Sequence, residues 1–126
     1  MMRTGVGVVM ALALGTAPAQ AAAGSFAVSV PGGELAGRVA WNASTATVDA
    51  VVVGHRQDRW TTAIVLAYSG DTQVGAWTQG VLREAKEFSV ELGEPGVVVS
   101  RVTAQVCAPV GQTRERCSSV KELHRR

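Results

Sequence analysis

The sequence predicts an all-β protein, a small antiparallel β-sandwich of about seven or eight strands. Short runs alternate between apolar and polar side chains, the period of a strand with one buried face. Clusters of Gly, Pro, Asn, Asp and Ser separate these runs at intervals of about eight to twelve residues. No segment alternates strands with long helical patterns, which argues against an α/β fold.

Residues 1–23 are expected to be a signal peptide. Arg3 supplies a positive start, residues 5–15 are uncharged and apolar, and small residues at Ala19, Ala21 and Ala23 fit a signal peptidase site. An apolar run of about 11 residues is too short for a membrane span, which needs about 20. We therefore expect cleavage near Ala21 to Ala23, a secreted protein and one mature domain at 24–126.

The charge balance excludes one class of partner. Of 12 Lys and Arg residues only Arg3 lies in the signal peptide, so 11 basic residues stand against 10 acidic ones. A nucleic-acid-binding domain has a much stronger basic excess. We expect no nucleic-acid partner, no membrane span in the mature chain, no cofactor and a monomer.

The first half of the mature chain contains four predicted strands, at 25–30, 35–43, 47–54 and 60–69. The second and third have one apolar and one mixed face. The fourth is apolar on both faces, with Thr62, Ile64, Leu66 and Tyr68 opposite Ala63, Val65 and Ala67, which is typical of a central strand.

The second half is harder to divide. Residues 74–92 fit either a strand, a connection and a strand or a short helix across 81–86, and we favour the strands because Gly75 and Gly80 discourage a long helix. Further strands are expected at 97–107 and 117–123, with 124–126 as a frayed tail. The expected core consists of Phe26, Val39, Trp41, Val52, Ile64, Leu66, Trp77, Phe88, Val90, Val102 and Val106.

The two cysteines, Cys107 and Cys117, are predicted to form a disulfide because the chain is exported. The nine residues between them suit a wide hairpin, and the default interpretation is a staple on the last hairpin. The alternative is recognition: Arg114 and Arg116 on a closed loop 108–116 would be ordered before binding. Such a loop suits a trypsin-like protease inhibitor or an acidic partner.

The tryptophans offer a second binding hypothesis. Trp41 shares a face with Leu35 and Val39, which favours the core. Trp60 and Trp77 lie near expected strand ends, where exposed aromatic rings can stack on the apolar faces of sugars. A carbohydrate or cell-wall binding module is therefore an alternative, against burial of both rings at the ends of the core.

Catalytic and metal chemistry receive little support from the sequence. His55 has Asp58 three residues on but no nucleophile motif beside it, so a small hydrolase is the weakest hypothesis. No His and Cys pair has zinc spacing, and we expect no metal site. Glu84, Glu87, Glu91 and Glu94 suit an edge strand kept soluble by charge better than a pair of catalytic carboxylates.

The chain also resembles a group of small uncharacterised secreted β-sandwich proteins of high-GC Gram-positive, actinomycete-like bacteria. The residues that carry the resemblance are the strand with Trp41, the turn at 69–71, the alternating run at 88–90 and VTAQVC at 102–107 followed by a second cysteine. It implies secretion and a β-sandwich, and it supplies no functional residues. We therefore expect a secreted, non-catalytic binding or structural protein.

Overall fold

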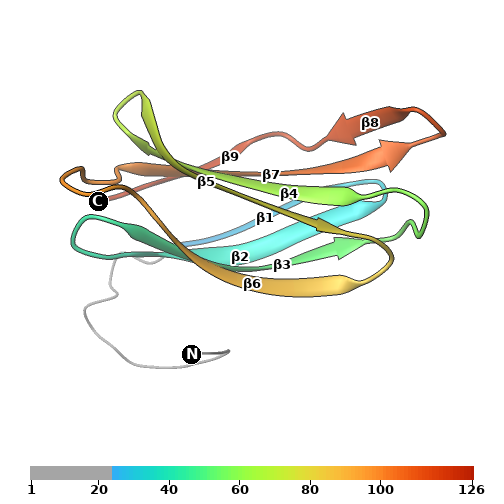
Figure 1. Cartoon of the computed structure of the whole chain (residues 1–126), viewed down its shortest axis with the longest axis horizontal. Coiled ribbons are helices and arrows are strands. Elements are labelled where there is room, and N and C mark those ends of the chain that lie inside the picture. Colours follow the sequence, from blue (N-terminus) through green and yellow to red (C-terminus); the bar gives the residue numbers. More distant parts are fainter. Residues whose placement is uncertain (1–23) are drawn as a thin grey trace.

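A computed structural model describes residues 24–126, and the predicted signal peptide at 1–23 lies outside this part of the chain. The described residues form nine strands in two antiparallel sheets stacked face to face (Figure 1). The strands are β1 (Gly24–Val30), β2 (Gly33–Trp41), β3 (Ala46–Gly54), β4 (Thr61–Ser69), β5 (Thr72–Val81), β6 (Ala85–Leu92), β7 (Arg101–Val110), β8 (Arg114–Cys117) and β9 (Lys121–His124).

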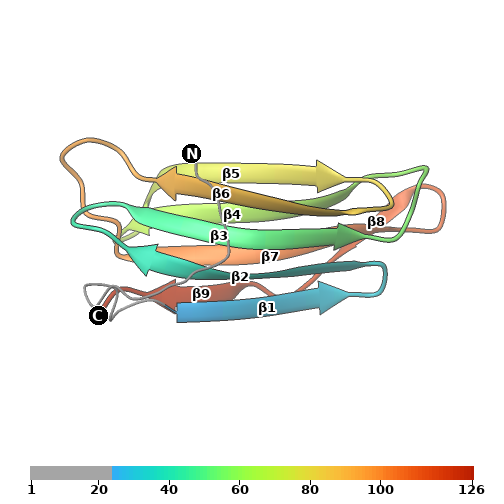
Figure 2. The same cartoon turned by 90° about the horizontal axis from the view of Figure 1, so that it is seen from below.

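The first sheet has the order β1-β2-β3-β6, and the second has the order β5-β4-β7-β8, with β9 also paired to β7. The chain passes from the second sheet to the first between β5 and β6, at residues 82–84. In the view of Figure 2, β5 and β6 lie along one side of the molecule, and β1 and β9 lie along the other. The predicted β-sandwich is therefore confirmed.

The structure decides between the two interpretations of 81–86 and changes the bounds of the last strands. The segment forms no helix, and residues 82–84 turn sharply between two strands, as the favoured interpretation expected. The strand expected at 97–107 runs instead from Arg101 to Val110, and the one expected at 117–123 is divided between β8 and β9. None of the residues that the structure describes belongs to a helix able to cross a bilayer.

The core lies between the sheets and follows the alternation of the strands. In β2, Leu35, Val39 and Trp41 point inward, and β3 contributes Val48 and Val52. These β-branched and aromatic residues suit a pleated surface with one buried face. Six expected core residues are buried: Phe26, Val39, Trp41, Val52, Val102 and Val106.

The assignment of Ile64 and Leu66 to the core is wrong. Both are half-buried on the outward face of β4, while Ala63 and Val65 point inward with no exposed surface. The reason is register: Ala63 pairs with Val106 and Val65 with Ala104, and β7 has only one strongly apolar face to bury. Because β4 is apolar on both faces, its own periodicity could not identify the inner one.

Trp77, Phe88 and Val90 occupy the margin of the core rather than its centre. Trp77 pairs with inward-facing Val65 but remains 38% exposed because β5 is an edge strand. Its ring lies 6.3 Å from that of Phe88, centroid to centroid, on the edge strand of the opposite sheet. The two rings therefore cover the core along the side formed by β5 and β6, and both side chains remain partly exposed.

The expectation of a frayed tail is also wrong, because Arg125 joins the two sheets. Its guanidinium donates hydrogen bonds to the carbonyl of Val99 at 2.6 Å, of Asn42 at 2.7 Å and of Thr45 at 3.2 Å. It also lies 5.2 Å from the centre of the Trp41 ring. The backbone amide of Val99 donates to Ser44 in the same region. Arg125 thereby ties the β2–β3 turn to the segment before β7.

Replacing Arg125 with Ala should lower the free energy of unfolding by about 2 kcal/mol, because three carbonyl groups lose a charged donor and Trp41 loses its cation. Urea unfolding at equilibrium measures the change. Arg126→Ala is the matched control, since it removes the same charge from an exposed neighbour. Equal unfolding midpoints for the two variants would contradict this role.

Candidate functional site

The disulfide joins residues that lie directly opposite each other on β7 and β8. Cys107 pairs with Cys117 in the register of the two strands, and their Cα atoms are 3.9 Å apart. Pairing continues to Val110 and Arg114, so only residues 111–113 form the turn. The expected wide loop at 108–116 is therefore a narrow two-stranded hairpin, and the predicted disulfide is confirmed.

Ser118 connects the hairpin to the last strand. β8 and β9 both pair with β7, but along different parts of it, and Ser118 lies between them. Its amide donates to the carbonyl of Val106 at 2.8 Å, and its hydroxyl accepts from the amide of Val106 at 3.1 Å. The hydroxyl thus completes the hydrogen bonding of β7 where the neighbouring strand is interrupted.

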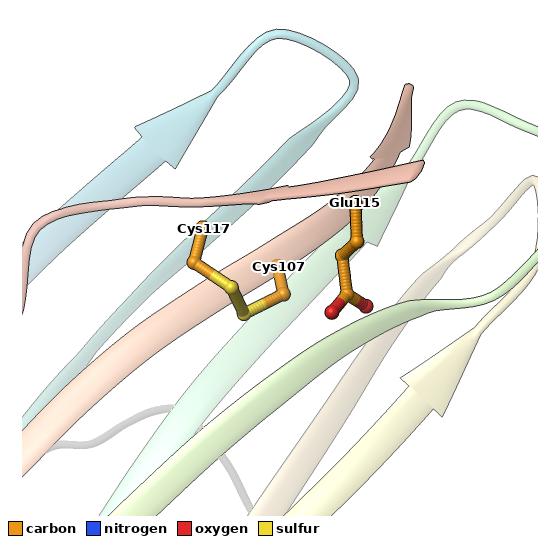
Figure 3. A group of neighbouring side chains, drawn as sticks. All are labelled: Cys107, Glu115 and Cys117. Atoms are coloured by element: carbon orange, nitrogen blue, oxygen red, sulfur yellow. A yellow bond between two sulfur atoms is a disulfide. The ribbon is translucent and has the colours of Figure 1, made fainter. Parts of the chain in front are cut away.

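Glu115 lies beside the disulfide on the same face of the hairpin (Figure 3). Its carboxylate and the two sulfur atoms lie within 4.8 Å of one another, a separation that could suit metal ligands. Metal binding by cysteine requires free thiolates, and both sulfur atoms here are joined to each other. In this oxidised form Glu115 alone could bind a cation, so the group carries no metal assignment.

Arg114 and Arg116 point away from the disulfide. They pair with Val110 and Ala108, whose positions alternate with those of the cysteines, so the two arginines occupy the opposite face of the hairpin. Both are exposed, and within residues 24–126 neither forms an ion pair. They lie in a paired strand, whereas the turn itself consists of Gly111, Gln112 and Thr113.

A polar loop holds the hairpin turn in place. Arg56 and Arg59 donate to the carbonyl of Gly111 at 2.7 and 3.2 Å, respectively. Arg56 is oriented in turn by the carboxylate of Asp58, at 2.9 and 2.6 Å. These hydrogen bonds from Arg56 lower the pKa of Asp58 from its usual value. The hairpin is therefore fixed both by its disulfide and by the loop between β3 and β4.

The outward face of the second sheet forms a different kind of surface, which we call the β4 face. Its outward residues are Trp60, which directly precedes β4, and Thr62, Ile64 and Leu66 in β4. The neighbours that pair with these β4 residues are Ala76, Thr78 and Gly80 on β5 and Thr103, Gln105 and Cys107 on β7. A row of large side chains along β4 is thus flanked by smaller or polar side chains on β5 and β7, and no described element covers the row.

Trp60 is the most exposed large hydrophobic residue of this face, at 59%. A Cβ atom placed on Gly80 would lie 3.2 Å from the Trp60 ring, so the ring rests directly over this glycine. Any larger residue at position 80 would push the ring outward. Trp60 is therefore both supported from below and open to solvent above.

The two tryptophans predicted to bind carbohydrate lie on opposite faces of the second sheet. Trp60 packs on Gly80, which pairs with outward-facing Thr62. Trp77 pairs with inward-facing Val65 and contacts Phe88. The two rings cannot form one continuous platform. Ile64 and Leu66, which the sequence assigned to the core, are the residues that extend the surface beside Trp60.

The outward faces of the two sheets differ in charge. On the β4 face, strands β4 and β5 present no charged side chain. β7 presents Arg101, stacked 4.0 Å from the centre of the Tyr68 ring, and β8 and β9 add Glu115, Glu122 and His124 at the far side of the sheet. The outward residues of the first sheet include five charged ones: Glu34, Arg38, Asp49, Glu87 and Glu91. The part of the β4 face formed by β4 and β5 is therefore the surface best suited to a neutral partner.

The residues considered for catalysis do not assemble. His55 approaches Glu34 at 3.8 Å, while Asp58 is engaged by Arg56. His124 is close to Glu122, at 3.1 Å, on the exposed strand β9. Among the described residues neither histidine is hydrogen-bonded to a serine or threonine hydroxyl, the arrangement that nucleophilic catalysis by a triad requires.

Comparison of the chain with known protein families, with curated proteins and with solved structures finds no match.

Replacing both cysteines with alanine should lower the free energy of unfolding by about 2–3 kcal/mol, the entropy expected for closing a loop of this length. Thermal and urea unfolding of the double variant measure the loss. Wild-type protein treated with dithiothreitol is the control and should show the same shift. An unchanged unfolding midpoint in both samples would contradict a stabilising role for the disulfide.

Proposed function

We propose that this protein is an exported, non-catalytic binding protein that recognises a neutral carbohydrate polymer, such as a cell-wall glycan, through the β4 face. The single observation that supports the proposal is the exposed ring of Trp60 beside β4 and β5, whose outward residues include no charged side chain. Tryptophan is the residue type that most often dominates binding energy at recognition surfaces. An exposed ring supported by backbone loses little conformational entropy when a ligand covers it.

The chemistry of the β4 face suits a sugar polymer. Pyranose rings have apolar C–H faces, which the indole of Trp60 and the aliphatic Ile64 and Leu66 can cover. Thr62 and Gln105 stand beside them and offer a hydroxyl and an amide for sugar hydroxyl groups. Binding sites commonly combine a mainly apolar surface with a few polar groups that orient the ligand.

Export is part of the proposal. The predicted signal peptide at 1–23 gives the route, and a disulfide between Cys107 and Cys117 is the state expected for cysteines in an oxidising compartment. A glycan outside the cell membrane would then be within reach. β4 is paired with β5 on one side and β7 on the other, which fixes its outward side chains. The surface therefore needs no rearrangement before binding.

The protease-inhibitor hypothesis remains a second candidate with less support. One observation favours it: Arg116 is exposed on an extended strand that a disulfide fixes. The position of Arg114 and Arg116 within the paired strand argues against it, because a protease requires access to an extended segment on both sides of the scissile residue.

Trp60→Ala should reduce binding to an insoluble glycan by about tenfold or more, since loss of a central aromatic contact commonly costs at least 1.4 kcal/mol. Co-sedimentation with purified peptidoglycan and with chitin measures the bound fraction. Trp60→Phe should retain part of the affinity because it keeps an aromatic face.

Val98→Ala is the matched control, since it removes another exposed apolar side chain, 50% exposed, from the connection before β7. It should bind as the wild type does. Failure of the wild type to bind any glycan at concentrations near 1 mM, or equal binding by Trp60→Ala, would overturn the proposal.

A further inference from the structure

β5 ends the second sheet, and its outer backbone edge is hydrogen-bonded to no other described strand. An unpaired edge strand exposes a row of N–H and C=O groups that can pair with another chain. Natural proteins usually protect such edges with charged residues, prolines or bulges. β5, with the sequence TQVGAWTQGV, has no charged residue and no proline.

The neighbouring edges are protected in the expected way. β6, which lies beside β5 in Figure 2, contains Lys86, Glu87 and Glu91. β8 and β9, at the other end of the second sheet, have the sequences RERC and KELH. Of the four acidic residues that the sequence assigned to an edge strand, Glu87 and Glu91 lie in β6 and protect it, while Glu84 and Glu94 lie just outside it. β5 has no charged residue in a comparable position.

One protective feature limits the accessible part of β5. The pairing with β4 shifts by one residue opposite Ala67 and Tyr68, a bulge that bends the beginning of β5. Beyond it, Gly75 to Val81 continue in regular register. Within this stretch the side-chain amide of Gln79 donates to the carbonyl of Gly80 at 3.1 Å, so this carbonyl already has a hydrogen-bond donor.

We propose that two copies of this chain associate through β5, pairing antiparallel so that their second sheets become one continuous sheet. The partner is a second copy because a twofold contact pairs β5 with an identical strand. Such a contact brings like charges close together when the strand is charged, and β5 carries no charge. A twofold axis at Thr78 places Thr78 opposite its copy and Ala76 opposite Gly80. All three residues point outward and are small enough for close approach.

β1 is the other edge strand without charge, with the sequence GSFAVSV, but it is shorter and Pro31 follows it directly. It also lies beside β9, which carries Lys121, Glu122 and His124. A second copy approaching that side would meet like charges. Pairing through β5 instead brings the two β4 faces side by side, but it does not depend on what those faces bind.

Sedimentation velocity from about 10 μM to about 1 mM tests the association, without any glycan present. The wild type should move from monomer toward dimer across this range, because edge pairing buries less area than a standard interface. Thr78→Lys and Thr78→Asp should each weaken association at least tenfold through like charges directly opposite. An equimolar mixture of the two variants should regain it, which a folding defect would not allow.

Ser29→Lys on β1 is the matched control and should dimerise as the wild type does. The proposal is overturned if the wild type remains monomeric throughout, if Ser29→Lys rather than Thr78→Lys prevents association, or if the mixture of charged variants fails to associate. Because the samples contain no polysaccharide, none of these outcomes bears on glycan binding, and the two proposals can fail separately.

Discussion

The pairing of β4 with β7 is the constraint on which the remainder of the molecule depends. It sets Ala63 against Val106 and Val65 against Ala104, and so commits one face of β4 to the core. A shift of one residue would exchange every inward and outward side chain of β4. The same register therefore fills the core with small residues and places Ile64 and Leu66 outside beside Trp60. β7 then holds β8 and β9 along its other edge.

The sequence predicted the β-sandwich and most strands because their periodicity is unambiguous. In β2 and β3 one face is apolar and the other mixed, and Val39 and Val52 are buried as expected. In β4 both faces are apolar, so local pattern cannot decide which is inner. That decision belongs to the partner strand, which is distant in sequence. Side-chain size is also a poor guide, because the inward residues of β4 include two alanines.

Sequence reasoning identified Cys107, Cys117 and Trp60 from their residue types and paired the two cysteines correctly, but it could not place Trp60 relative to the hairpin that they join. It treated 108–116 as a loop because the turn residues Gly111 to Thr113 are few and the arginines of β8 resemble a loop composition. It also missed the role of Arg125, whose partners are carbonyl groups of Asn42, Thr45 and Val99. Backbone acceptors leave no signature in sequence, so no residue pattern pointed to this contact.

The two proposals use different parts of one sheet. The β4 face offers flat apolar area, and the edge of β5 offers unpaired backbone. Together they would give a dimer two adjacent copies of a weak binding surface, and a polymer that spans both would be held more tightly than by either. Of the stabilising features, Ser118 and Arg125 lie outside the row of Trp60, Ile64 and Leu66, and the disulfide lies at the margin of the β4 face, where Cys107 pairs with Thr62.

The most direct test of the β4 register is a comparison of Val65→Asp with Leu66→Asp by circular dichroism and urea unfolding. The structure predicts that Val65→Asp prevents folding, because a carboxylate would be buried without a partner. It predicts that Leu66→Asp folds with a modest loss of stability, since its side chain can reach water. If Leu66→Asp unfolds the protein and Val65→Asp does not, the assignment of the outward face, and the binding surface built on it, is wrong.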